Sequence, residues 1–169
     1  LTFEYHHLQE FRRGGDLLNR PPHEANIAEQ LRHSINSGGL KFDYFSPDEK
    51  HRLSVYASAQ HIGRDSYYGG NQDLNAYGAT KDFTWVAGSQ YIYHFDRCLF
   101  MPSDLTGGVE YNQDNLKDDM WGYNRYTNQK VHIAGAFFQN EWRNRQWSIL
   151  LGGRLDKHNL INHVIFSPR

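Results

Sequence analysis

The chain has 169 residues, of which 38% are hydrophobic and 15% aromatic, and its formal net charge is −1. A nearly neutral chain lacks the basic patch that nucleic-acid binding requires, and this many aromatic residues are not typical of a disordered chain. Cys98 is the only cysteine, which excludes an internal disulfide and a cysteine-based zinc site. No run of about 18 apolar residues is present, so we expect no transmembrane helix.

Eight strands are predicted, because apolar and polar side chains alternate with a period of two along much of the chain. In chain order, the predicted strands cover residues 1–11, 26–46, 51–62, 81–95, 98–111, 131–142, 146–156 and 161–167. The alternation is clearest in the third, fifth and seventh strands, and a bulge is expected at Gly38-Gly39 in the second. The pattern predicts an all-β fold, an antiparallel meander of about eight strands in a single segment over residues 1–169.

Each of the clearest strands has one apolar face that needs a covering. The residues that represent this face are Leu53, Val55, Val109, Ile149 and Leu151. A strand of a membrane barrel shows the bilayer only every second residue, so low overall hydropathy fits a barrel wall as well as a soluble sheet. If the strands span a membrane, we expect these side chains to contact lipid or detergent.

The connections between the predicted strands alternate in length. Residues 46–50, 96–97 and 143–145 form short turns, whereas residues 12–25, 63–80 and 112–128 form long polar loops. Aromatic residues gather beside the short turns: Phe42, Tyr44, Phe45, Tyr93, Phe95, Phe100, Trp142 and Trp147. Aromatic girdles, short periplasmic turns and long extracellular loops are typical of outer-membrane barrels. We therefore expect part of a transmembrane β-barrel with this arrangement.

Several motifs resemble those of one family of membrane proteins. In chain order, they are Glu10-Phe11-Arg12-Arg13-Gly14-Gly15-Asp16, Ala57-Ser58-Ala59-Gln60, Arg64-Asp65-Ser66-Tyr67-Tyr68-Gly69, Thr106-Gly107-Gly108-Val109-Glu110-Tyr111, Gln139-Asn140-Glu141-Trp142, Gly152-Gly153-Arg154-Leu155-Asp156 and Phe166-Ser167-Pro168-Arg169. The most specific part is the pair formed by Gly-x-Arg-x-Asp and the closing Ser-Pro-Arg. On these residues, nearly the whole chain resembles the barrel of Bacteroidetes-type TonB-dependent outer-membrane receptors.

The resemblance implies a section of a large barrel, of the 22-stranded plugged kind. Such receptors import scarce nutrients (iron chelates, haem or cobalamin) with energy that TonB passes from the inner membrane. The implied partners are outer-membrane lipid, a small nutrient ligand, and TonB through a plug region that this chain is expected to lack. No enzymatic activity, cofactor or nucleic acid is implied. An eight-strand run could also close on itself as a small barrel.

Two of the predicted loops carry the candidate ligand-binding residues. Arg12 and Arg13 open the first loop, and two arginines can bind an anionic group. Arg64, Tyr67 and Tyr68 open the second loop, where tyrosine rings can stack on a planar ligand or a sugar. Binding residues concentrate on loops that a rigid scaffold carries. The alternative for the arginines is that they form charge pairs within the loops.

Arg154 and Asp156 lie two residues apart on the polar face of the seventh predicted strand, and we expect both to face the barrel lumen. Pairing with charges on neighbouring strands or on a plug is favoured over substrate binding. The sequence has 10 histidines. His6 and His7 point to opposite faces of a strand, and no histidine pair has the spacing of a helical zinc motif. No metal site is predicted.

Two other classes of function stay open. A soluble β-sandwich that binds carbohydrate through Trp and Tyr side chains would pack the same apolar faces against each other. Alternation does not separate this structure from a barrel, because each of them covers one face of every strand. The aromatic girdle and the rhythm of the connections favour the barrel. An enzyme is the third class, and no catalytic constellation supports it.

Overall fold

The computed structural model describes all 169 residues as one β-sheet with two single-turn 3₁₀ helices in its connections. The strands are β1 (Thr2–Gly15), β2 (Ile27–Phe45), β3 (His51–Gly70), β4 (Tyr77–Cys98), β5 (Met101–Met120), β6 (Arg125–Arg143), β7 (Ser148–His158) and β8 (Ile165–Pro168). The helices are η1 (Pro22–Glu24) and η2 (Trp121–Tyr123). Neither helix has the length or the apolar composition needed to cross a membrane.

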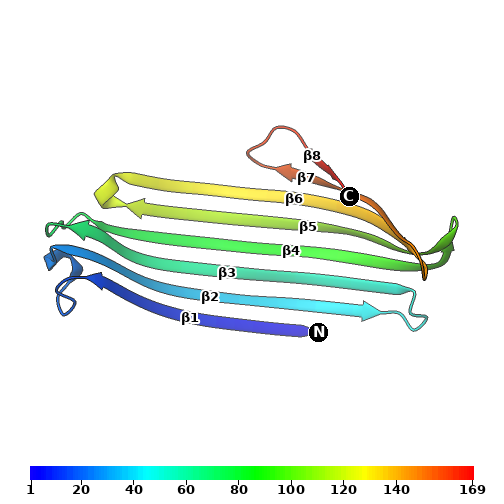
Figure 1. Cartoon of the computed structure of the whole chain (residues 1–169), viewed down its shortest axis with the longest axis horizontal. Helices are drawn as coiled ribbons and strands as arrows, with labels where there is room; N and C mark the ends of the chain where they lie inside the picture. The colour runs from blue at the N-terminus through cyan, green and yellow to red at the C-terminus, as the bar shows by residue number, and fades with distance from the viewer.

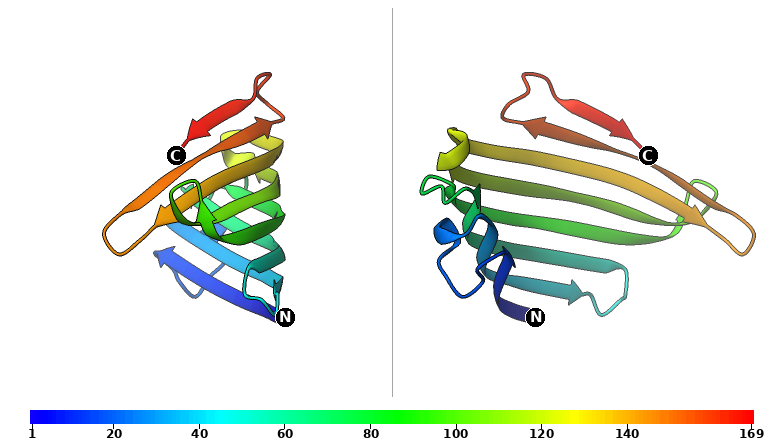
Figure 2. Two further views of the ribbon diagram at one scale, coloured as in Figure 1. Left: turned by 90° about the vertical axis from the view of Figure 1, so that its right-hand side faces the viewer. Right: turned by 60° about the vertical axis from the view of Figure 1, so that its left-hand side comes forward.

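The strands follow one another in the sheet in chain order, and each pairs antiparallel with the next. Figure 1 shows them side by side, and Figure 2 shows one twisted layer with β1 and β8 at its two edges. The prediction of an all-β antiparallel meander of eight strands is therefore confirmed. The sheet is open, so these strands do not close into a small barrel by themselves.

Two of the three predicted long loops are wrong, because most of residues 63–80 and 112–128 belong to strands, whereas most of residues 12–25 do form a connection. The connections span residues 16–26, 71–76 and 121–124, where residues 12–25, 63–80 and 112–128 were expected. The strands continue in unbroken register through residues 63–70, 77–80, 112–120 and 125–128, so two long hairpins with short connections replace the second and third loops. Polar side chains predominate on both faces of these segments, so the alternation that marks a strand in the sequence ends there although backbone pairing continues.

Two smaller predictions are also wrong. Gly38-Gly39 lies in continuous register with β1 and β3, so the sheet has no bulge there. The irregularity lies between Phe95 and Cys98, where the register of β4 with β5 shifts. As a result β4 continues through the expected turn at residues 96–97, and the chain reverses at Leu99, which has a φ of 63°.

No second layer covers the sheet, and this leaves an unusually large surface. The accessible area is 11618 Å², whereas a compact monomer of 19.8 kDa has roughly 8,600 Å². The small cluster of buried hydrophobic residues comprises Ala25, Ala28, Tyr67 and Ala76, where residues 16–26 fold back on the end of β3. A soluble sandwich would need a second sheet, and these residues form only one.

Candidate functional site

The strand register places the alternating side chains on two defined faces of the sheet. Residues paired across neighbouring antiparallel strands lie on the same face. One such row crosses five strands, and it contains Val55, Ser89, Val109, Ala136 and Leu155. The apolar sets of the separate strands therefore join into one surface, which we call the apolar face. The opposite surface is the polar face.

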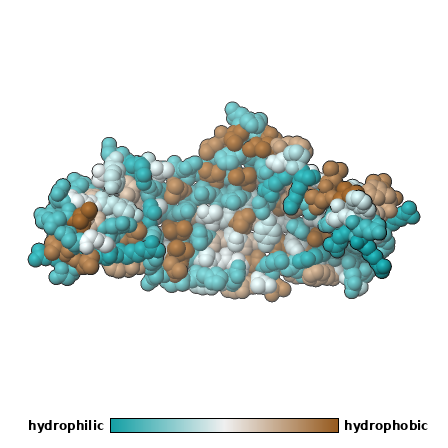
Figure 3. Space-filling model, viewed as in Figure 1, coloured by the Kyte–Doolittle hydropathy of each residue, from teal (hydrophilic) through white to brown (hydrophobic).

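A band of hydrophobic side chains covers the apolar face beside the short turns at residues 46–50, 99–100 and 144–147. Its members include Phe42, Tyr44, Leu53, Val55, Tyr91, Tyr93, Leu105, Val109, Phe138, Trp142, Ile149, Leu151 and Leu155. In β6 the band runs over residues 134–142, close to the roughly 9–11 residues of a tilted transmembrane strand. We call the part of the sheet with this band the near half and the remainder the distal half. In the view of Figure 3 hydrophilic residues cover most of the sheet, and apolar residues gather around the β7–β8 hairpin.

Aromatic rings border the band at both of its ends. Beside the short turns, Phe100 and Trp142 stack with their ring centroids 5.7 Å apart, and Tyr93 lies on the neighbouring part of β4. At the border with the distal half, the ring centroids of Trp85 and Tyr111 lie 5.1 Å apart. Amphipathic rings at two levels, with aliphatic side chains between them, are typical of the two interfaces of a membrane.

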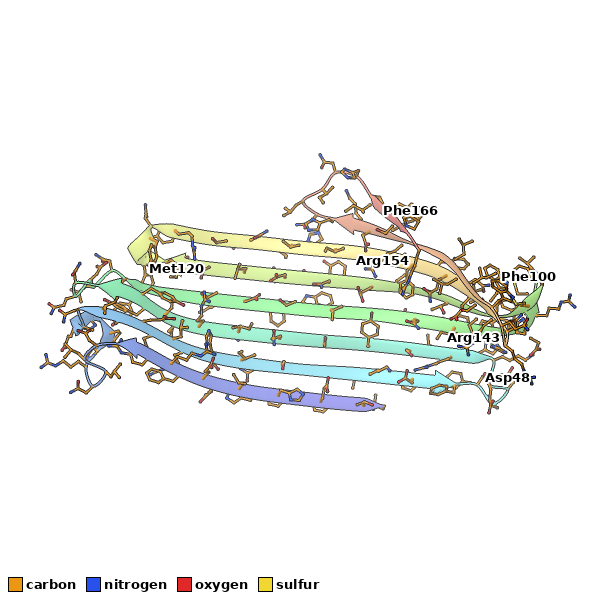
Figure 4. The ribbon with its side chains drawn as sticks, viewed as in Figure 1. Asp48, Phe100, Met120, Arg143, Arg154 and Phe166 are labelled. Atoms are coloured by element: carbon orange, nitrogen blue, oxygen red, sulfur yellow. The ribbon has the colours of Figure 1, made fainter.

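A hydrogen-bonded network crosses the polar face of the near half from β3 to β7. Tyr56 Oη donates to Glu110 Oε2 at 2.6 Å, and Arg154 Nη2 donates to Glu110 Oε1 at 3.2 Å. Arg154 Nε also donates to both carboxylate oxygens of Asp156 at 2.9 Å. Figure 4 shows Arg154 away from both ends of the sheet. Arg154 and Asp156 lie on the polar face, and their exposure to a barrel lumen stays a prediction.

Two glycines make room for this network. A Cβ atom at Gly88 would lie 2.6 Å from Tyr56 Oη, and one at Gly135 would lie 2.6 Å from Arg154 Nη2. The phenol of Tyr56 and the guanidinium of Arg154 therefore lie across the backbone of the intervening strands to reach Glu110. Any larger residue at Gly88 or Gly135 forces one of these groups to move.

A second network holds the polar face of the distal half together around Asp118. Its carboxylate accepts hydrogen bonds from the Thr80 hydroxyl, from Arg125 Nη2 at 2.9 Å and from Arg64 Nη2 at 3.3 Å. The hydrogen bond from Thr80 is the main cause that lowers the pKa of Asp118, and the two arginines lower it further against the opposing effect of burial. This cluster joins β3, β4, β5 and β6 at the end of the sheet far from the short turns.

Arg12 and Arg13 lie in β1, and as neighbours in a strand they point to opposite faces. Arg12 Nη2 lies 2.7 Å from Glu10 Oε1. Arg13 Nη1 donates to the carbonyl oxygen of Gly14 at 2.8 Å. The two guanidinium groups therefore do not converge on a single anion, and their contact with a ligand stays a prediction for each one separately.

The tyrosines of the second candidate set also point to opposite faces. Tyr67 is 0% exposed, and its hydroxyl donates to the carbonyl oxygen of Asp73 at 2.9 Å. Its ring packs edge-on against Tyr77, so it offers no open surface for stacking. Tyr68 lines a hollow of about 420 Å³ together with Tyr123. Arg64, the third member, takes part in the Asp118 network, so only Tyr68 lies at a hollow.

Several histidines bond to nearby polar side chains, whereas the buried Nδ1 atom of His132 has no partner. His7 Nδ1 lies 2.8 Å from Asn36 Oδ1, and His94 Nδ1 lies 2.6 Å from Asp104 Oδ1. No group of three or more His, Cys, Asp or Glu side chains is arranged to hold a metal ion. None of these histidines is therefore placed in a cluster with metal-binding geometry.

The sequence analysis missed one feature of the apolar face. Asn140 is buried among apolar side chains of β5, β6 and β7, and its amide has no hydrogen-bond partner. The sequence signal was weak, because β6 has Phe137 and Phe138 on successive positions and its alternation is mixed. Phe137 lies on the polar face over Gly108, where an added Cβ would lie 2.6 Å from its ring.

A sheet built in this way can separate an apolar medium on one side from water on the other. Its charged groups pair with one another on the polar face, and its hydrophobic band is left uncovered on the other. Comparison with known proteins adds no assignment, since no family model, no curated protein and no solved structure matches the chain.

Proposed function

We propose that this chain forms part of the wall of a transmembrane β-barrel in the outer membrane, within a TonB-dependent receptor that imports a scarce nutrient. The observation that carries the proposal is the single hydrophobic band on one uncovered face, bordered by aromatic rings. Exposed apolar patches larger than a few hundred Å² mark interaction sites or membrane contacts rather than ordinary soluble surface. Lipid tails would cover this band over the length of a transmembrane strand.

The opposite face suits the interior of such a barrel. Barrel interiors are polar, and in plugged receptors the lumen holds protein and water rather than lipid. The network of Tyr56, Glu110 and Arg154 keeps its charges paired on that side. The proposed role of this wall is to enclose a transport pathway, and it assigns no catalysis to the chain.

The two most specific motifs of the resemblance lie next to each other in space. Gly153 pairs with Pro168, and Arg154 pairs with Ser167. The backbones of Gly152 and Arg169 extend the ladder with two reciprocal hydrogen bonds of 2.8 Å. The motifs therefore form one structural unit, which supports the receptor family as the source of this wall. The family implies a plug, TonB and a ligand of the iron chelate, haem or cobalamin class as partners.

The open edges and the distal half fit the same proposal. An exposed strand edge has unpaired backbone groups, and inside a membrane these must be paired with further strands. β1 and β8 would therefore continue into neighbouring strands of the parent barrel. The distal half of β3, residues 61–70, extends about 30 Å at about 3.3 Å per residue. This half would project from the membrane on the extracellular side.

Tryptophan quenching by brominated lipid tests the proposal. Single-tryptophan variants keep Trp85, Trp142 or Trp121 and replace the other tryptophans with Phe, and each is refolded into vesicles. We expect brominated acyl chains to quench Trp85 and Trp142, which lie on the apolar face, and to leave Trp121 in η2 almost unaffected. Equal emission of all three variants, together with a compact monomer in buffer without lipid or detergent, would overturn the membrane assignment.

A further inference from the structure

A groove on the apolar face lies where β6, β7 and β8 meet. Its volume is about 480 Å³, which lies in the range of roughly 300–1,000 Å³ for ligand pockets. The side chains that form its walls are Phe138, Trp142, Leu151, Leu155 and Phe166. Figure 4 shows Phe166 on the short β8 strand beside β7. Gly153 pairs with Phe138 and has no side chain, which lets the Phe166 ring lie against its backbone: a Cβ atom there would be 2.7 Å from that ring.

A buried amide without partners lies at one end of this groove. Asn140 is 6% exposed, and neither its Oδ1 nor its Nδ2 atom has a hydrogen-bond partner. Its register neighbours are Leu105 in β5 and Leu151 in β7, which are both apolar. Ser103, 3% exposed and paired with Trp142, also has a hydroxyl without a partner. Buried polar groups are nearly always hydrogen-bonded, so these orphan groups indicate a missing partner.

The groove has Asn140 at one end and only apolar side chains at the other, and their order along the strands indicates how a ligand would be oriented. Asn140 lies one same-face position from Trp142, the last residue of the band before β6 ends beside the short turn. From Asn140 the groove runs away from the turn to Ala136 and Leu155, in the middle of the band. A ligand seated in it would place its polar group at the level of the aromatic border and its apolar part among the aliphatic side chains.

We propose that the groove binds one glycerophospholipid molecule. One acyl chain lies along Phe138, Leu155 and Phe166. The Asn140 amide, whose atoms are closed off in the lipid-free chain, turns toward the groove, and an ester carbonyl oxygen accepts a hydrogen bond from its Nδ2. This inference rests on the proposed function, because a lipid takes this orientation only when the apolar face lies in a bilayer with the short turns at one interface. An ester lipid matches both parts of the groove, since it combines a hydrogen-bond acceptor at the interface with a chain in the hydrocarbon region.

Native mass spectrometry tests the lipid site. The chain is reconstituted with phospholipid and moved into increasing detergent, and the fraction that retains one lipid is measured. We expect Asn140→Leu, which removes the amide, and Ala136→Leu, which fills the groove from an exposed position, to lower this fraction about tenfold. The matched control is Ser89→Ala, a change from polar to apolar on the same face but outside the groove, and it should retain lipid like the unmodified chain. An ether-linked phospholipid, which lacks the ester carbonyl, should be retained as poorly as ester lipid on Asn140→Leu.

The outcomes separate the lipid site from the membrane assignment. Equal retention by all variants, or equal retention of ester and ether lipids by the unmodified chain, would show that Asn140 holds no lipid. A dimer without lipid that dissociates on the Ala136→Leu change would replace the lipid with a second copy of the chain. If Trp142 is quenched by brominated lipid in every variant, the membrane assignment survives either result. If no variant enters vesicles and the chain is instead a compact monomer in buffer without lipid or detergent, the proposed function itself fails.

Discussion

The near half and the distal half of the sheet share the same continuous strands but are stabilised differently. In the near half, exposed apolar side chains such as Leu151 lie opposite the network around Glu110. In the distal half polar side chains predominate on both faces, with isolated exposed apolar residues such as Phe83. Lys117 and Asp119 pair at 3.3 Å on one face, while Asp118 bonds to arginines on the other. The ladder between β5 and β6 crosses from one half to the other without a register shift.

The two halves show that a strand can form through backbone hydrogen bonds where its sequence has no alternation of apolar and polar residues. Of the 119 backbone hydrogen bonds, 102 lie within the helices and strands, and they run through both halves. Alternation marks only the part of a strand whose two faces meet different surroundings. In the distal half the residues on both faces are mainly polar, so the sequence does not alternate. Charge pairs and backbone hydrogen bonds stabilise these hairpins, and the apolar pattern does not predict them.

A charge placed in the hydrophobic band should cause the largest loss of stability, because the band is the feature that most clearly distinguishes the near half from the distal half. Leu151 is 64% exposed on the apolar face of β7. In a bilayer, Leu151→Arg should destabilise the folded chain by about 2–4 kcal/mol, because the guanidinium must lie in hydrocarbon. The measurement is the free energy of unfolding by urea in lipid vesicles.

The control for Leu151→Arg adds the same charge to the distal half. Asn128 is exposed and lies on the extension of the same face, paired with Lys117. Asn128→Arg places a like charge opposite Lys117, but both groups are exposed to water, so the unfolding free energy should fall by less than about 1 kcal/mol. If both variants lose similar stability, or neither does, the band is not the part of the sheet that contacts lipid.

The glycines under the polar network give the next largest effect. Gly135→Ala places a Cβ atom 2.5 Å from Asp156 Oδ1 and 2.6 Å from Arg154 Nη2. We expect a loss of about 1–3 kcal/mol, because overpacking forces the guanidinium away from Glu110. Gly107→Ala is the matched control, since its Cβ would have no neighbour closer than 3.7 Å. Equal unfolding free energies for the two alanine variants would show that the network contributes little to the near half.

Alternation in the sequence was sufficient to predict which residues of the near half lie on the apolar face, but it did not predict how far the strands extend into the distal half. The apolar positions at Leu53, Val109 and Leu151, predicted strand by strand, lie on one face because the antiparallel register joins them. The strand ends were missed, because polar residues such as Asp118 were interpreted as loop. A charged residue in a strand and one in a loop have the same composition, and only the partner strand distinguishes them.

For the site residues, the sequence predicted the face of the sheet on which each one lies but not the contacts that it makes. Arg154 and Asp156 were placed on the polar face by alternation, but the link from Arg154 to Glu110 depends on the one strand between them, β6. The burial of Tyr67 depends on residues 16–26 folding back onto β3, a contact that no local pattern reports. The burial of Asn140 was missed because its apolar neighbours, Leu105 and Leu151, lie in the two adjacent strands and not near it in the sequence.

Removal of the Asp118 carboxylate should destabilise the distal half and leave the near half unaffected. Asp118→Asn weakens the hydrogen bonds to Arg64 and Arg125, and charged hydrogen bonds of this kind contribute about 1–2 kcal/mol. Amide hydrogen exchange should quicken at the distal ends of β4 and β5 while the near half stays protected. Asp119→Asn is the control, because Asp119 makes a partly exposed pair with Lys117 and such pairs contribute little. Faster exchange across the whole sheet would mean that the two halves unfold as one unit.

Acid should act on the same hairpins with a smaller effect, and its sign follows from the pKa of Asp118. The hydrogen bond from Thr80, with help from Arg125 and Arg64, lowers this pKa below its value in the unfolded chain. The stabilising contribution is therefore fully present above about pH 4, the unfolded value, and is lost as the pH falls through the folded pKa. Amide exchange is intrinsically slower at acid pH, so the quantity to compare is the protection factor relative to the intrinsic rate at each pH. Protection of the distal half should fall at acid pH in the unmodified chain, and the difference from Asp118→Asn should vanish there. A difference between the two proteins that stays constant from neutral to acid pH would mean that Asp118 acts through its shape and not through its charge. Ion pairs would then contribute less to the stability of the distal half than the networks on its polar face suggest.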